Sequence, residues 1–185
     1  MTKSTRNSLI LLFASLLLPG CSTPTINSYR APSLQINLEH VYVLSYLNYG
    51  KLAHISNAKH TERILQQRLT ESGVNVRLAS ITGLELDPEA YKRDIASSGA
   101  KHILQIVPTR TQNHGRALTY SYELRLHDVS AKRVVWRAWL SQTTYPFQTF
   151  ESFSKEFGAT VLKKMSDDGI CKCQTLRPQD APGKE

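Results

Sequence analysis

The feature that most restricts the fold of this chain is a pair of β-prone segments in its second half. Leu118–His127 places leucine or tyrosine at every second position, with polar or charged residues between them. This period of two is typical of a β-strand that buries one face. After a turn-like segment, Asp128–Lys132, the chain continues into a second strand-like segment, Arg133–Thr143. The two segments predict an antiparallel hairpin, and its apolar face requires another layer packed against it.

Before this hairpin, strand-like and helical segments alternate along the chain. We expect strands at His40–Tyr46, Val74–Leu78 and His102–Val107, with Pro108 ending the third. We expect helices at about Asn57–Ser72, ended by Gly73, and from Asp87 to Gly99. Strands that are joined through helices favour parallel pairing with right-handed crossovers.

A last helix is expected at about Phe150–Asp168, because the sequence has an apolar stripe with helical spacing, formed by Phe150, Phe153, Phe157, Val161 and Met165. The element order β-α-β-α-β-β-β-α predicts an α/β (α+β) fold over residues 37–170. Its single mixed β-sheet would have the helices packed on it.

The first twenty residues predict a cleaved signal peptide. Lys3 and Arg6 precede an apolar run, Leu9–Leu18, which is too short to cross a membrane as a helix. The following residues, Leu18-Pro19-Gly20-Cys21, resemble the lipobox of bacterial lipoproteins. That resemblance implies cleavage before Cys21 and lipidation of its side chain. The alternative is an ordinary signal peptide with an incidental Cys21, and Pro19 suits a small-x-small cleavage site poorly.

A lipidated Cys21 would hold the protein at a membrane, since three acyl chains make release negligible. Ser22 stands where an inner-membrane lipoprotein usually has Asp, so the resemblance implies the outer membrane, with the protein facing the periplasm. Residues 21–36 are rich in Ser, Thr, Pro and Asn and are expected to form a lipidated tether.

Composition gives a basic chain without a concentrated basic patch. The net charge of +8 falls to +6 without the first twenty residues, because these hold Lys3, Arg6 and no acid. The positive charges are scattered, which favours a solvated basic surface. An exported chain rarely meets nucleic acid, so we expect no nucleic-acid partner.

Two further cysteines, Cys171 and Cys173, lie near the C-terminus in residues 171–185, which are expected to form a flexible tail. An exported compartment favours a disulfide between them. An unpaired or intermolecular thiol is the second interpretation, and a soft-metal site is the third.

The hairpin carries a resemblance to a group of envelope lipoproteins. The strand Tyr122–Asp128, the turn after it and the segment Arg133–Ala138, with its V-V-W sequence, resemble a pattern in this group. The group includes the DUF4136-type lipoproteins, the curli-secretion lipoprotein and the lipoprotein activator of penicillin-binding proteins. Their domain resembles the N-terminal domain of TolB, and Gly99–Leu104 and Gly73–Val76 are also similar. The resemblance covers about Val41–Met165 and implies a scaffold or partner-binding role, without implying a substrate.

We find no motif of a known catalytic site. The chain has no G-x-S-x-G, H-E-x-x-H, Walker A or G-x-G-x-x-G sequence, and its six histidines are scattered. We therefore expect no enzyme, no metal and no cofactor.

Two segments are possible partner-binding loops. One is Thr109–Ala117, with Arg110, Asn113, His114 and Arg116; the other is Leu47–Lys51, with Asn48, Tyr49 and Lys51. The sequence favours a lipid-anchored, non-catalytic binding or scaffold module for another envelope protein or the cell wall. Two alternatives remain open: a small-molecule-binding or hydrolytic site on the same domain, and a redox or metal role of Cys171 and Cys173.

Overall fold

The computed structural model describes residues 23–32, 36–49, 55–87 and 89–173. The described residues form one six-stranded sheet in the order β1-β6-β5-β4-β2-β3, together with three helices. The strands are β1 (Thr25–Arg30), β2 (His40–Ser45), β3 (Asn75–Ser80), β4 (His102–Asn113), β5 (Leu118–Asp128) and β6 (Arg133–Thr144). The helices are α2 (Ile55–Glu71), α3 (Ala90–Ser98) and α4 (Phe150–Asp167).

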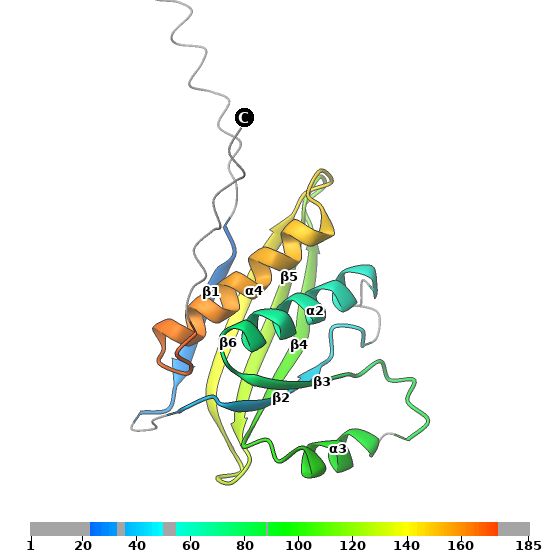
Figure 1. The fold of residues 1–185 in the computed structure, drawn as a ribbon. Coiled ribbons are helices and arrows are strands. Elements are labelled where there is room, and N and C mark those ends of the chain that lie inside the picture. Colours follow the sequence, from blue (N-terminus) through cyan, green and yellow to red (C-terminus); the bar gives the residue numbers. More distant parts are fainter. Residues whose placement is uncertain (1–22, 33–35, 50–54, 88, 174–185) are drawn as a thin grey trace, which may run out of the picture.

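The predicted α/β class and single mixed sheet are confirmed. β2 pairs in parallel with both β3 and β4, as its helical crossovers require. β4, β5, β6 and β1 pair in antiparallel order. Figure 1 shows α2 and α4 lying side by side across one face of this sheet. We call this face the inner face and the opposite one the outer face.

The main core lies between the inner face and the two long helices. Trp136 on β6 and Phe157 on α4 are almost completely buried there. Two edge-to-face ring pairs join β5 to α4: Tyr122 with Phe157, and Tyr120 with Phe153, at centroid distances of 5.2 and 5.7 Å. Aromatic pairs in this geometry add to the stabilisation from burial alone. The alternating apolar residues of β5 therefore pack against α4, which supplies the second layer that the hairpin pattern predicts.

A smaller core on the outer face explains why β2 does not alternate. Tyr42 and Leu44 point away from the long helices and pack with Tyr91 and Ile95 of α3. The Tyr42 hydroxyl also donates a 2.6 Å hydrogen bond to Asp94. Because β2 is covered on both faces, it reads as a continuous apolar segment. α3 lies over the β2 end of the outer face.

The prediction of a flexible tether up to residue 36 is wrong for Thr25–Arg30. These residues form β1, which pairs with β6 at the edge of the sheet, from Thr25 beside Ser141 to Arg30 beside Trp136. The strand lacks an apolar pattern because two of its three inward residues, Ser28 and Arg30, are polar. Their partners lie at the far end of the chain.

Asp168, directly after α4, provides those partners. Its Oδ2 atom accepts hydrogen bonds from the Ser28 hydroxyl at 2.5 Å and from Trp136 Nε1 at 2.7 Å. Lys164 Nζ lies 3.0 Å from Oδ1, and Arg30 donates to the backbone oxygen at 2.6 Å. Burial would raise the pKa of Asp168, but the hydrogen bonds from Ser28, Trp136 and Lys164 outweigh it and lower that pKa. One carboxylate thus joins β1, β6 and α4.

β4 is longer than the sequence predicts. It does not end at Pro108 but continues to Asn113, with an irregularity in its pairing with β5 between Pro108 and Arg110. A proline lacks a backbone N–H and is tolerated in a sheet at such a bulge. The predicted loop Thr109–Ala117 is therefore strand up to Asn113, and only the residues after it form the turn.

The prediction of a flexible tail is wrong at its beginning. Cys171 and Cys173 are joined in a disulfide, with Cα atoms 5.1 Å apart. They are only 7% and 3% exposed and belong to the main core. The chain therefore remains packed for several residues after α4. Residues 174–185 lie outside the described part.

We predict that Asp168→Asn lowers the free energy of unfolding by about 1–3 kcal/mol, because hydrogen bonds to a charged acceptor are replaced by weaker ones. Asp167→Asn is the matched control, since Asp167 is exposed and forms its ion pair with Lys163 on the same helix. Urea unfolding measures both variants, and an equal loss in both would contradict the prediction.

The same carboxylate predicts a pH dependence. The pKa of Asp168 is lower in the folded chain than in the unfolded chain, so its ionised form stabilises the fold above about pH 3.9. This contribution disappears as the pH falls through the lower, folded pKa. The stability difference between the wild type and Asp168→Asn should therefore shrink between neutral pH and about pH 3, as followed by urea unfolding at each pH.

Candidate functional site

The first predicted loop supports a neighbouring segment. Asn48 Nδ2 donates to the Ser80 hydroxyl, which donates to Glu62, both at 2.9 Å. The ring of Tyr49 packs against Gly83, where an added Cβ would lie 2.7 Å from the ring. Asn48 and Tyr49 thus hold the end of β3 and the segment after it. Lys51 lies outside the described residues, and a partner-binding role for this loop stays a prediction.

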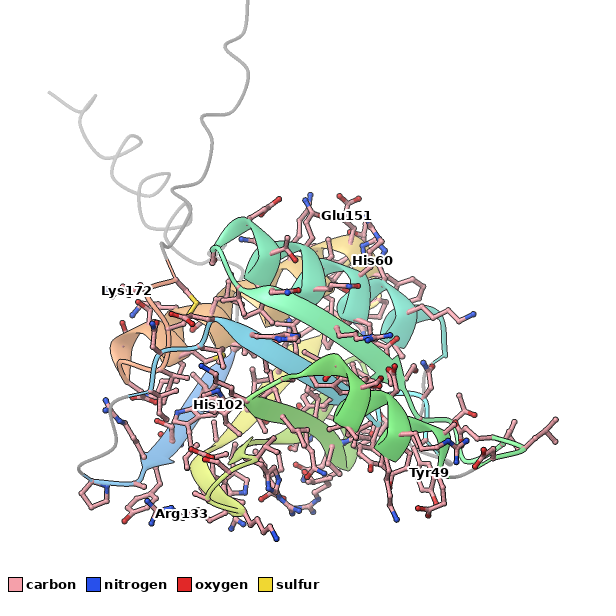
Figure 2. The ribbon with its side chains drawn as sticks, turned by 60° about the horizontal axis from the view of Figure 1, so that its bottom comes forward. Tyr49, His60, His102, Arg133, Glu151 and Lys172 are labelled. Carbon is pink, nitrogen blue, oxygen red and sulfur yellow. A yellow bond between two sulfur atoms is a disulfide. The ribbon has the colours of Figure 1, made fainter. Side chains whose placement is uncertain are left out.

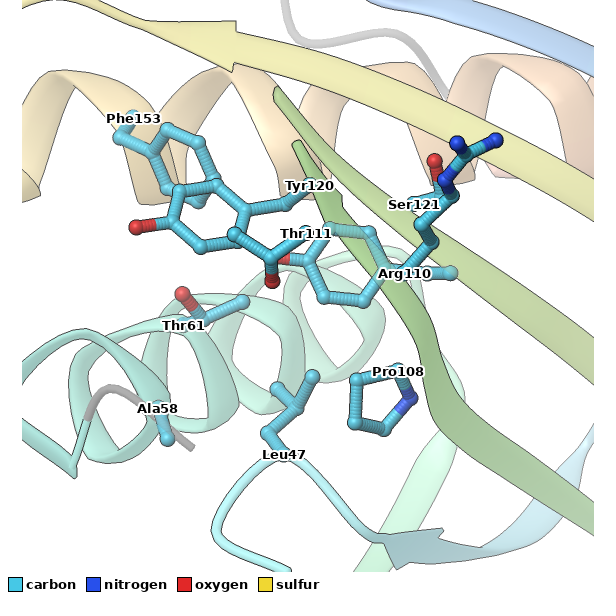
Figure 3. Close-up of a pocket in the computed structure, with 10 residues that line it drawn as sticks. Leu47, Ala58, Thr61, Pro108, Arg110, Thr111, Tyr120, Ser121 and Phe153 are labelled. Atoms are coloured by element: carbon cyan, nitrogen blue, oxygen red, sulfur yellow. The ribbon is translucent and has the colours of Figure 1, made fainter. Parts of the chain in front are cut away.

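The two predicted loops meet at a small gap beneath α2. Leu47 from the first and Arg110 and Thr111 from the second line it, and Figure 3 shows Tyr120 and Phe153 beside the same space. Its volume is about 20 Å³. That is room for a single water molecule, whereas a small-molecule site needs hundreds of cubic ångströms. On the helix side, the hydroxyls of Thr61 and Ser154 lie 2.9 Å apart and hydrogen-bond to each other.

The remaining predicted residues gather at one end of the sheet. We call this end the tip: the β4–β5 turn around Gly115 and the connection from β6 to α4, residues 145–150. A surface hollow of about 450 Å³ separates the two segments and is lined by Asn113 and Arg116 on one side and Tyr145 and Phe150 on the other. Asn113 Oδ1 accepts from the Gly115 N–H at 2.9 Å, and Gly115 has φ +77°, so a glycine suits this turn.

The tip combines exposed aromatic rings with cations. Phe147 is 82% exposed, Phe150 is 55% exposed, and Tyr145 stacks on Phe147 with ring centroids 5.5 Å apart. The β4–β5 side carries Arg116, Arg110 lies further back on β4, and residues 108–122 contain no acid. The sequence predicts the cations of this site but not its aromatic half. The sequence signal for the aromatic half is the presence of Tyr145, Phe147 and Phe150 within six positions. Pro146 among them makes this segment look like an ordinary linker.

The chain enters the sheet at this same end. Thr25, the first residue of β1, lies beside Ser141, only three residues before β6 ends at Thr144. Thr144 in turn lies beside Leu118, at the turn of the tip. Cys21 lies outside the described residues, but it precedes Thr25 by four residues. A fully extended chain of four residues spans at most about 14 Å.

The outer face carries a second polar and aromatic surface that the sequence does not predict. Glu123 pairs with Arg125 and with Arg137, whose Nε lies 3.1 Å from its carboxylate, and both arginines lower the pKa of Glu123. The Arg137 guanidinium lies 5.8 Å from the centre of the exposed Trp139 ring. Tyr29 and Val134 line a surface hollow of about 290 Å³ with these two residues.

The titratable groups in the described ranges form no metal centre. No group of three or more His, Cys, Asp or Glu side chains among them is placed to hold a metal ion. Burial lowers the pKa of His102 and of His127, and His127 lies 3.0 Å from the Gln105 side-chain oxygen. No helix in the same ranges is long and apolar enough to cross a membrane.

Comparison with known proteins identifies the fold. The sequence matches no protein-family model and no curated protein sequence. Among solved structures, a PelC dodecamer from Paraburkholderia phytofirmans is similar, with 22% sequence identity and a TM-score of 0.53 over 76% of this chain and 95% of that chain. The lipoprotein GNA1162 from Neisseria meningitidis aligns with 16% identity and a TM-score of 0.45, over 70% of this chain and 99% of that one. The chain therefore has a fold that also occurs in PelC.

Proposed function

We propose that this chain is a lipid-anchored protein of the bacterial envelope that acts as a non-catalytic scaffold at the inner surface of the outer membrane. The observation that carries the proposal is the position of Thr25. The strand that follows the lipobox-like sequence begins at the end of the sheet where the exposed rings and cations of the tip lie. The scaffold would bind another envelope protein or the cell wall.

The short distance to Cys21 orients the domain. Because Cys21 is only four positions before Thr25, the start of β1 would lie within about 14 Å of the anchoring point, at the end of the sheet that carries the tip. Aromatic rings are favoured at the interface between lipid and water, and cations are attracted to anionic headgroups. Phe147, Phe150 and Arg116 would therefore contact the membrane, and the opposite end of the sheet would point into the periplasm.

A scaffold of this kind gains binding surface by self-association. The similar PelC structure is a dodecamer. We propose that several copies of this chain also assemble side by side on the membrane. Anchoring favours such assembly, because it confines all copies to one layer and raises their effective concentration.

The described residues give less support to the two alternatives. A small-molecule or hydrolytic site would need an enclosed pocket, and the gap between the two predicted loops holds about 20 Å³. A redox or metal role of Cys171 and Cys173 would need access to sulfurs that are almost completely buried and joined to each other.

We predict that Cys21→Ala removes the protein from the outer-membrane fraction of its cells, because the variant cannot be lipidated. Ser22→Asp is the matched control, since it keeps the anchor but should redirect the protein to the inner membrane. Fractionation followed by in-cell crosslinking measures location and partners together. Retention of Cys21→Ala in the outer-membrane fraction at the wild-type level would contradict the anchor.

We predict that the tip binds lipid independently of the anchor. In a Cys21→Ala background, Phe147→Ser with Phe150→Ser should weaken sedimentation with phosphatidylglycerol vesicles at least tenfold, because each buried phenylalanine ring contributes about 1.5–3 kcal/mol. Val129→Ser is the control, because it removes an exposed apolar side chain next to the β5–β6 turn, away from the tip. Equal binding by both variants would show that the tip does not contact lipid.

A further inference from the structure

The connection between β3 and α3 carries two leucine side chains that are exposed to solvent. We call residues 82–87 the leucine loop. Leu84 is 86% exposed and Leu86 is fully exposed. Large apolar side chains that are exposed so close together often mark a surface that binds another molecule. Nothing in the fold described above uses them.

The leucine loop is held in one shape. Glu85 accepts hydrogen bonds from the backbone N–H of Thr82 at 2.5 Å and of Gly83 at 2.9 Å, and the Leu84 N–H donates to the Thr82 hydroxyl at 3.2 Å. Gly83 has φ +80° and lies against the Tyr49 ring, so a side chain there would be strained and would clash. The two leucines are therefore presented by a fixed loop, which reduces the entropy lost on binding.

The leucine loop also carries an uncompensated negative charge. Hydrogen bonds from Thr82 and Gly83 lower the pKa of Glu85, so its carboxylate is ionised at neutral pH. In the described part of the chain, Glu85 forms no ion pair; Asp87 and Glu89, close by, pair with Arg93 and Lys92. A surface that fits this loop should be apolar and should carry a cation.

The opposite edge of the sheet has such a surface. The hollow of about 290 Å³ at β1 and β6 has apolar walls from Tyr29, Val134 and Trp139. Arg137 lines this hollow and shares the carboxylate of Glu123 with Arg125 on the neighbouring strand β5, so these three side chains together carry one positive charge in excess. An apolar hollow near a net positive charge thus suits the apolar, negatively charged leucine loop.

The two surfaces cannot meet within one molecule. The leucine loop follows β3 and the hollow lies at β1 and β6, at opposite ends of the strand order. Figure 2 shows Tyr49, which touches the leucine loop, and Arg133, at the start of β6, on opposite sides of the molecule. With five spacings of about 4.8 Å, the sheet separates its edge strands by about 24 Å.

We propose that the leucine loop of one copy docks into the β1–β6 hollow of the next copy. This inference rests on the proposed assembly of copies and names the surfaces that make it. The contact is heterologous, so it repeats in one direction and generates a ring if the rotation closes. Because it joins lateral edges of the sheet, every copy can keep its tip toward the same membrane.

Cysteine crosslinking of the full, lipidated chain in intact cells tests the contact. Leu84→Cys with Val134→Cys, treated with copper phenanthroline, should give a ladder of disulfide-linked species on a non-reducing gel. Cys171 and Cys173 are already paired with each other. Leu84→Cys with Gln66→Cys is the control, because Gln66 is exposed on α2; this pair should give no ladder.

A second measurement distinguishes a failure of the proposed docking contact from a failure of the copies to assemble at all. In chains without added cysteines, Leu84→Ser with Leu86→Ser should reduce the amine-crosslinked oligomer at least tenfold, whereas Val129→Ser, at another exposed apolar residue, should leave it unchanged. Wild-type oligomers without a cysteine ladder, or an equal ladder from the control pair, would overturn the docking but not the scaffold. A monomeric wild type would overturn both.

Discussion

The packing of α4 on the inner face of β5 and β6 is the interaction on which the rest of the structure depends. Phe153 and Phe157 fit against the tyrosines of β5 and fix the position of the helix. The end of that helix then places Asp168 where it meets β6 and β1. An edge strand with little apolar surface of its own is thereby held by a helix that is packed in the core.

Much of the fold follows from the sequence, because the decisive patterns are local. The alternation of β5 and the apolar stripe of α4 each reveal a buried face without knowledge of its partner. The continuous apolar sequence of β2 likewise indicates a strand that is buried on both faces. The parallel pairing of β2 with β3 and β4 then follows from the helices that connect them.

What the sequence does not show depends on distant partners. Ser28 and Arg30 look like loop residues until Asp168 lies next to them, about 140 residues later in the chain. Pro108 looks like a strand end until the bulge accommodates it. The candidate surfaces follow the same rule, since the cations near Gly115 and the rings near Phe147 become one site only when the sheet brings their two turns together.

β1 also determines how the domain resists force. A lipid at Cys21 would transmit any pull from the membrane to Thr25, at the end of β1 nearest the tip. A pull along the strand axis acts on all the hydrogen bonds between β1 and β6 at once, in shear, and on the contacts of Ser28 and Arg30 with Asp168 as well. A sideways pull would instead open the pairs one after another from Thr25. The strand is therefore mechanically strongest along its own axis.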